Sequence, residues 1–216
     1  MSVKHVLRYL QGTIDYGLDY VRIDGVRLAG FADLDWAGST SNRRSTSGCC
    51  FGFGSAVVSW LSRKQKFVAL SSAEAEYIAT NLASCEGLWL RKLLSGLFDA
   101  ELSPTVIYCD NQNCIKLTEN PVFHDGTKHI EIKYHFVRDW AQKGAVKLKY
   151  VSTDEQVVDI SKSLPRDKHV YFRDKMGVVR NTFLGVTTQS CTIREPVWSR
   201  QRLSKFFSEF QKTMVQ

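Results

Sequence analysis

The stretch Val26-Arg-Leu-Ala-Gly-Phe-Ala-Asp-Leu-Asp35 is an apolar segment that ends in two carboxylates. Its length and apolar character predict a buried β-strand. Asp24-Gly25 precedes it, and an Asp-Gly pair between two apolar segments indicates a hairpin, here with residues 18–22 as the partner strand. Two more strand-like segments follow at residues 49–53 and 56–61. The first third of the chain is therefore predicted to be an antiparallel meander.

The longest predicted helix covers residues 72–98, where apolar residues recur every three or four positions along one stripe. Ser71 and Glu74 have the spacing of a capping box at its start. The other expected elements are strands at residues 105–109 and 146–150 and helices at residues 3–10, 113–117, 130–142 and 156–163. This order predicts an α/β fold with a mixed sheet, in which three antiparallel strands are followed by parallel strands with flanking helices.

The composition is typical of a soluble globular protein with a basic surplus. The 216 residues carry a formal net charge of +7, which favours a polyanionic partner, although a basic protein without such a partner fits the charge equally well. The six cysteines have apolar neighbours and form no Cys-x-x-Cys pair, so we expect buried reduced thiols. Since no signal peptide and no transmembrane run of ~18 apolar residues stands out, we expect an intracellular protein of the cytoplasm or nucleus.

Two carboxylates follow apolar strands, Asp33 in the first third of the chain and Asp110 after residues 105–109. Ligand sites in α/β sheets gather at the carboxyl ends of strands, where neighbouring carboxylates repel unless a cation lies between them. Glu76 is in the first turn of the long helix, and Asp159 is in the helix expected at residues 156–163. Helices packed on the sheet could bring both to the strand ends. Such a set suits Mg²⁺.

Six segments in order along the chain resemble the RNase H domain of copia-type (LTR) retrotransposon Pol polyproteins. They cover roughly residues 1–185, and they are Phe31-Ala-Asp-Leu-Asp-Trp-Ala-Gly38 with residues 44–48, residues 58–60 with 62–66, Ala69-Leu-Ser-Ser-Ala-Glu-Ala-Glu-Tyr77, Tyr108-Cys-Asp-Asn-Gln112, residues 127–138 and residues 150–159. One segment departs from the family pattern: Val158-Asp-Ile-Ser-Lys162 stands where the family commonly has Ala-Asp-Ile-Leu-Thr-Lys, and the carboxylate is kept.

The resemblance implies an RNase H-like fold and an endonuclease that hydrolyses the RNA strand of RNA–DNA hybrids with two Mg²⁺ ions, or Mn²⁺. It also implies four carboxylates that are both catalytic and metal-binding, namely Asp33, Glu76, Asp110 and Asp159. Asp35, two residues after the first, is expected to help from outside the metal-ligand set. Helical spacing does not choose between Glu74 and Glu76; the capping role of Glu74 and the motif register favour Glu76.

The hybrid is expected to meet basic and amide side chains around the acidic residues. A basic run near the first strands contains Arg43, Arg44, Arg63, Lys64 and Lys66. Arg44 and Lys64 are the candidates for phosphate contacts, and a solvated hairpin edge is the equally weighted alternative. Asn111 and Gln112 are candidates for the minor groove, where 2′-hydroxyls distinguish RNA from DNA. The tryptophans Trp36, Trp60 and Trp89 are expected in the core.

The resemblance also divides the chain into three parts. Residues 1–20 correspond to the tail of the parent reverse transcriptase, a partner if it is intact; residues 21–185 are the RNase H-like domain, and residues 186–216 are a divergent tail with a possible amphipathic helix. Cellular RNases H use a histidine before their last helix, but residues 152–156 contain none. The earlier histidines, for which structural roles are favoured, are His124, His129 and His135.

Two other interpretations compete with an RNase H. A retroelement integrase would need a third carboxylate on a helix well after Asp110 and a zinc-binding His/Cys head, and neither stands out in the sequence. The other alternative is a catalytically silent fragment of a transposon protein, recruited as a nucleic-acid-binding, interaction or effector protein. The presence of all four carboxylates favours the enzyme over this alternative.

Overall fold

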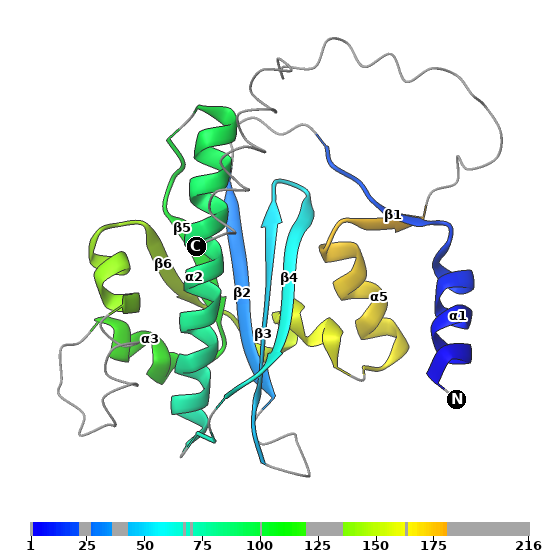
Figure 1. Ribbon diagram of the computed structural model, residues 1–216, viewed down its shortest axis with the longest axis horizontal. Coiled ribbons are helices and arrows are strands. Elements are labelled where there is room, and N and C mark those ends of the chain that lie inside the picture. The colour runs from blue at the N-terminus through cyan, green and yellow to red at the C-terminus, as the bar shows by residue number, and fades with distance from the viewer. Residues whose placement is uncertain are drawn as a thin grey trace.

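The central feature of the protein is a five-stranded mixed sheet (Figure 1). The computed structural model describes residues 2–21, 27–35, 43–66, 68–69, 71–99, 101–119, 136–162 and 164–180. Across the sheet the strands are β4 (Ala56–Lys64), β3 (Thr46–Phe53), β2 (Leu28–Asp35), β5 (Thr105–Cys109) and β6 (Val146–Tyr150). Strands β2, β3 and β4 are antiparallel, whereas β5 and β6 run parallel to β2. The predicted fold class, an RNase H-like sheet, is confirmed by this order and these directions.

One face of the sheet is covered by α2 (Ser72–Phe98), which has the bounds predicted from its periodicity. Its first turn is capped by Ser71, whose side chain accepts a hydrogen bond of 3.1 Å from the backbone N–H of Glu74. α2 packs against β2, β3 and β5, with Phe51 and Ile107 fully buried beneath it. The Phe51 ring fits because Gly30 faces it: a Cβ on Gly30 would lie 2.3 Å from a ring carbon.

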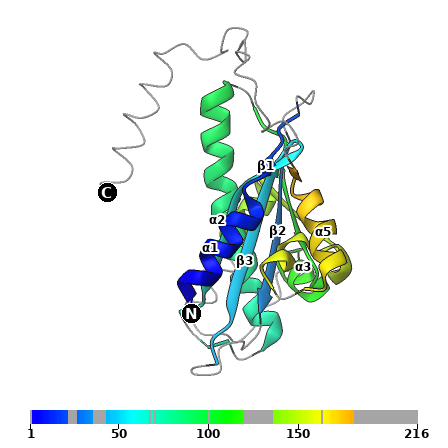
Figure 2. The same cartoon turned by 90° about the vertical axis from the view of Figure 1, so that its right-hand side faces the viewer.

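The opposite face is covered by segments from the end of the described chain (Figure 2). They are η1 (Thr153–Glu155), η2 (Val157–Ser161) and α5 (Arg166–Lys175). Phe172 of α5 is fully buried in a cluster with Cys50, Val57, Val157 and Val158. This apolar cluster holds η2 against β2 and β3.

The remaining elements lie beside these layers. They are α1 (Ser2–Thr13), α3 (Gln112–Glu119), helical residues 136–142, and the strands β1 (Tyr16–Leu18) and β7 (Val178–Arg180). Most of the large apolar side chains of α1 are exposed, among them Val3 and Tyr9. Within the described ranges, no helix combines the length and apolar character that a membrane span requires.

The structure corrects two predictions about the elements and adds two elements. The strand expected at residues 18–22 does not form a hairpin with β2: β1 pairs antiparallel with β7, and residues 22–26 lie outside the described part. The helix expected at residues 156–163 is the short 3₁₀ segment η2. Elements α5 and β7 were not predicted. β1, β7, η2 and α5 all make contacts with segments distant in sequence, which periodicity does not report.

The predicted burial of tryptophans is also wrong for the two candidates that the structure describes. Trp60 is 68% exposed and Trp89 is 46% exposed. Trp60 lies on β4, which is an edge strand of the sheet. Trp36, the three candidate histidines and the tail from residue 181 lie outside the described residues. The prediction of buried reduced thiols is confirmed for four described cysteines, which are Cys49, Cys50, Cys109 and Cys114. Cys85 is also a free thiol, but it is exposed.

Candidate metal-binding site

Two of the predicted carboxylates lie at the carboxyl ends of neighbouring parallel strands. Phe31 of β2 is paired with Tyr108 of β5, and the two rings stack with centroids 5.0 Å apart. Asp33 and Asp110 each follow two residues later, so the register brings both to the same edge of the sheet. Asp33 is 4% exposed. Asp110 is half-buried, and its Oδ2 accepts a hydrogen bond of 3.1 Å from the hydroxyl of Thr153.

Glu76 is brought to this edge by the N-terminal end of α2, one residue beyond its first turn. Together with Cys109 and Asp110 it forms a group whose potential ligand atoms all lie within 4.8 Å of one another. The Glu76 side chain is buried, and within the described residues its Oε2 has no hydrogen-bond partner. Burial, and then the negative potential of Cys109, Asp110 and Asp33, raise the pKa of Glu76 to about 9. A bound cation would offset both effects.

Asp159 reaches the site from η2, where its side chain is also buried. It shares an ion-pair partner with Asp33: Nζ of Lys162 lies 2.8 Å from Oδ1 of Asp159 and 2.5 Å from Oδ2 of Asp33. Burial raises the pKa of Asp33 to about 6, opposed by its hydrogen bond with Lys162. The pKa of Lys162 is raised overall. Burial lowers it, but the contacts with Asp159 and Asp33 outweigh burial.

The four predicted carboxylates therefore meet in one place, with Asp33 between two groups. On one side are Asp110 and Glu76, and the charges of Asp110 and Asp33 raise the pKa of Glu76; on the other are Asp159 and Lys162, which act on Asp33. Lys162 and Thr153 were not among the site residues predicted from the sequence. The spacing of three residues between Asp159 and Lys162 could have identified Lys162 as a site residue, since one helical turn brings two side chains at this spacing together.

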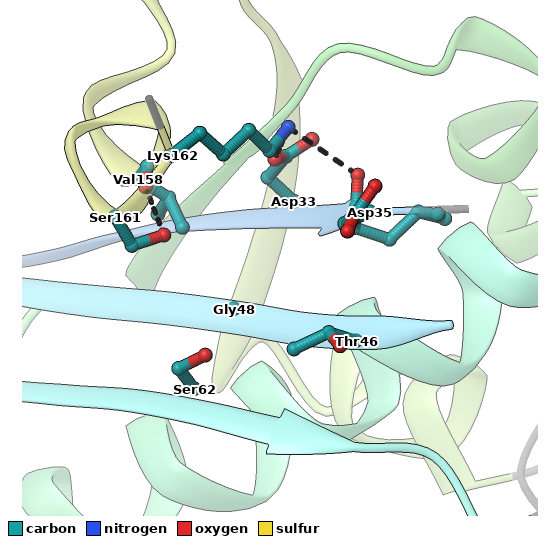
Figure 3. A pocket seen from close by; sticks show the side chains of 9 residues that line it. Asp33, Asp35, Thr46, Gly48, Ser62, Val158, Ser161 and Lys162 are labelled. Atoms are coloured by element: carbon teal, nitrogen blue, oxygen red, sulfur yellow. Dashed lines mark hydrogen bonds and ion pairs between the residues drawn. The ribbon is translucent and has the colours of Figure 1, made fainter. Parts of the chain in front are cut away.

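A polar pocket of about 330 Å³ opens beside Asp33 (Figure 3). It is lined by Asp33, Leu34, Asp35, Thr46, Gly48, Ser62, Val158, Ser161 and Lys162. Asp35 is exposed on this pocket, and its predicted helper role stays a prediction. Gly48 is needed where η2 approaches β3, because a Cβ there would lie 2.7 Å from Cγ1 of Val158.

The candidate substrate residues surround the site but differ in their present contacts. Oδ1 of Asn111 accepts hydrogen bonds from the backbone N–H groups of Asn113 and Cys114, so it caps α3, which Gln112 begins. Lys64 pairs in register with Thr46, which is itself paired with Asp35. Arg44 lies just before β3 on the same end of the sheet. The substrate-binding roles of these four residues stay predictions.

The raised pKa of Glu76 leads to a pH prediction for the protein in the presence of a chelator. The folded-state pKa of about 9 exceeds the ordinary value of 4.5, so between these values the folded protein binds more protons than the unfolded chain. The free energy of unfolding should therefore fall as pH rises from 6.5 to 8.5, by at most about 1.4 kcal/mol per pH unit. Urea unfolding measures it. Glu76→Gln should flatten this slope, and an equal slope in both proteins would contradict the assignment.

The buried carboxylates at the strand ends of an RNase H-like sheet define the class of protein: an RNase H-like domain with an acidic site. No family model matches the chain. The chain is 42% identical over 180 residues to the retrovirus-related Pol polyprotein from transposon RE2 of Arabidopsis thaliana and 39% identical over 183 residues to that from transposon TNT 1-94 of Nicotiana tabacum. It is thus homologous to retrotransposon Pol polyproteins. Each match covers 83% of this chain but only 12% and 14% of the relatives.

A further relative has a different description. The chain is 51% identical over 89 residues to "Secreted RxLR effector protein 161" of Plasmopara viticola, a match that covers 41% of this chain and 63% of the relative. Among solved structures, the N-terminal RNase H domain of rv2228c from Mycobacterium tuberculosis has a TM-score of 0.45 and 14% identity, covering 68% of this chain and 96% of that one. LC11-RNase H1 in complex with an RNA/DNA hybrid has a TM-score of 0.43 and 10% identity, covering 60% and 88%. The fold assignment rests on strand order and register.

Proposed function

We propose that this protein is an RNase H-type endonuclease that hydrolyses the RNA strand of RNA–DNA hybrids with two divalent ions, Mg²⁺ or Mn²⁺. The observation that carries the proposal is the meeting of Asp33, Glu76, Asp110 and Asp159 from four separate segments at one edge of the sheet. Burying several carboxylates together is unfavourable unless a cation compensates them. Homology to retrotransposon Pol polyproteins supports the same function.

The donor set fits a hard divalent ion. The side chains offer carboxylate oxygens, which Mg²⁺ prefers, and Oε2 of Glu76 is a buried oxygen with no hydrogen-bond partner in the described part of the chain. Asp33, Glu76 and Asp110 would hold an ion on one side of the site, and Asp33 and Asp159 on the other. When bound, such ions activate water and stabilise the leaving oxygen of a phosphodiester.

The chain itself supplies orientation and substrate contacts. Thr153 fixes Asp110 through its hydrogen bond, and the parallel pairing of β2 and β5 fixes the position of Asp110 relative to Asp33. In this proposal Arg44 and Lys64 contact backbone phosphates, which position a hybrid without reading its sequence. Asn111 and Gln112, which follow Asp110, contact the minor groove and its 2′-hydroxyls.

A cleavage assay with labelled strands tests the proposed function. Purified protein with Mg²⁺ or Mn²⁺ should cut the RNA strand of a hybrid, leave its DNA strand intact, and leave a DNA duplex of the same sequence intact. A chelator should stop the reaction. A cellular RNase H serves as the positive control. If folded protein cuts no hybrid under conditions where the control does, the enzyme proposal is wrong.

The second candidate is a catalytically silent protein recruited for binding or as an effector. It is favoured by the similarity over 89 residues to a secreted effector of Plasmopara viticola. It predicts that hybrid is bound without being cut, or is not bound at all. Filter binding beside the cleavage assay separates these outcomes from the enzyme.

A further inference from the structure

We propose that Lys162 is an internal cation of the acidic site: its ammonium takes the position between Asp33 and Asp159, so that the folded protein binds one divalent ion tightly beside Glu76 and Asp110 and a second only after the ammonium has moved. The inference rests on the proposed function, because it assumes that these carboxylates hold metal ions.

The position of the ammonium is defined by three oxygens. Nζ of Lys162 lies 2.5 Å from Oδ2 of Asp33, 2.8 Å from Oδ1 of Asp159 and 3.4 Å from the backbone oxygen of Leu34. The contacts with the two carboxylates are ion pairs, and the contact with the Leu34 backbone is a hydrogen bond. The two carboxylates are only 4% and 6% exposed, and they are the oxygens that an ion on this side of Asp33 would need.

The backbone holds Lys162 in place for these contacts. Its N–H donates a hydrogen bond of 2.8 Å to the backbone oxygen of Asp159, which ends η2. The side chain is nevertheless 39% exposed and lines the pocket of about 330 Å³ beside Asp33 (Figure 3). The exposed carboxylate of Asp35 lines the same pocket. The ammonium therefore has a polar space to enter when it leaves the two buried carboxylates.

The two sides of the site differ in how far a positive charge already compensates their carboxylates. The Asp33–Asp159 side already has a positive charge in contact with both carboxylates. Oδ1 of Asp159 and Oε2 of Glu76 both lack a hydrogen-bond partner among the described residues, but Oδ1 of Asp159 is in an ion pair with Lys162, whereas Cys109 and Asp110 lie beside Glu76. A divalent ion placed next to the ammonium meets like-charge repulsion, which an ion beside Glu76 and Asp110 meets less. The first ion is therefore expected on the Glu76 side.

Titration with Mn²⁺, followed by calorimetry and by the electron paramagnetic resonance signal of free Mn²⁺, tests the inference. Wild-type protein should show a tight first step and a weak second step. Lys162→Met should strengthen the second step by at least about tenfold, because it removes the competing charge. Lys162→Arg, which keeps the charge, and Lys143→Met, which removes a lysine that pairs with exposed Asp139, should both behave like wild type.

The outcomes separate this inference from the proposed function. Superimposable isotherms for wild type and Lys162→Met, or weaker binding at both steps in the variant, would overturn the role of Lys162 alone. Wild-type protein that binds no Mn²⁺ would overturn the metal site and the nuclease proposal with it. If Lys162→Met does not fold, Lys162→Gln replaces it, since its amide is uncharged but still donates hydrogen bonds to a carboxylate.

Discussion

Replacing Glu76 by Gln is expected to slow cleavage of an RNA–DNA hybrid by at least about a thousandfold while leaving the fold intact. A lost metal ligand removes several kcal/mol of transition-state stabilisation, and about 1.4 kcal/mol corresponds to each factor of ten in rate. The fold should tolerate the change because burial already favours the neutral form of Glu76, and an amide of the same shape resembles it. Single-turnover cleavage rates and thermal melting of the same preparations measure both effects.

Glu74 provides the matched control, two residues earlier on the same helix. Its backbone N–H donates to the capping side chain of Ser71, and this hydrogen bond does not depend on its carboxylate. Glu74→Gln should therefore keep the cleavage rate within about tenfold of wild type and lower stability by no more than about 1 kcal/mol. If Glu74→Gln were inactive and Glu76→Gln active, the assignment of the helix carboxylate would be wrong by two residues.

Replacing Phe172 by Ala should lower the free energy of unfolding by about 3–5 kcal/mol, as is usual when a buried aromatic side chain is removed. Phe172 is fully buried against Val157 and Val158 of η2 and against Cys50 and Val57 of the sheet. Because Asp159 also belongs to η2, the loosened cluster should weaken metal binding as well. Urea unfolding at neutral pH and Mn²⁺ titration measure the two effects.

An exposed aromatic side chain offers the control for this change. Trp60 is 68% exposed on the edge strand β4, so Trp60→Ala should change stability by no more than about 0.5 kcal/mol. Equal losses for Phe172→Ala and Trp60→Ala would show that α5 does not pack on the sheet as described.

The parts of the fold that follow local patterns could be predicted from the sequence. The bounds of α2, β5 and β6 match the predicted ranges, because α2 and β6 have the periodicity of their elements and β5 is a short apolar run with β-branched residues. The meeting of Asp33 and Asp110 also follows from sequence, since two apolar strands that run parallel place their next residues at one edge.

The parts that depend on distant contacts could not be predicted. β1 pairs with β7, more than 150 residues away, although a nearer turn signal suggested a hairpin. Residues 157–161 lie in a 3₁₀ segment because they pack between the sheet and Phe172. Lys162 ends the motif at residues 158–162. Its contact with Asp33, a residue 129 positions earlier, is visible only in the structure.

The most direct test of the central claim is the rate of hybrid cleavage as a function of Mg²⁺ concentration, measured in parallel for wild-type protein and Asp110→Asn. Wild type should be inactive in chelator and gain activity as Mg²⁺ rises. Asp110→Asn should be inactive at every concentration and at least as stable as wild type, because it removes a charge that acts on Glu76. Cleavage by Asp110→Asn at the wild-type rate, or wild-type cleavage that is unaffected by chelator, would contradict the account.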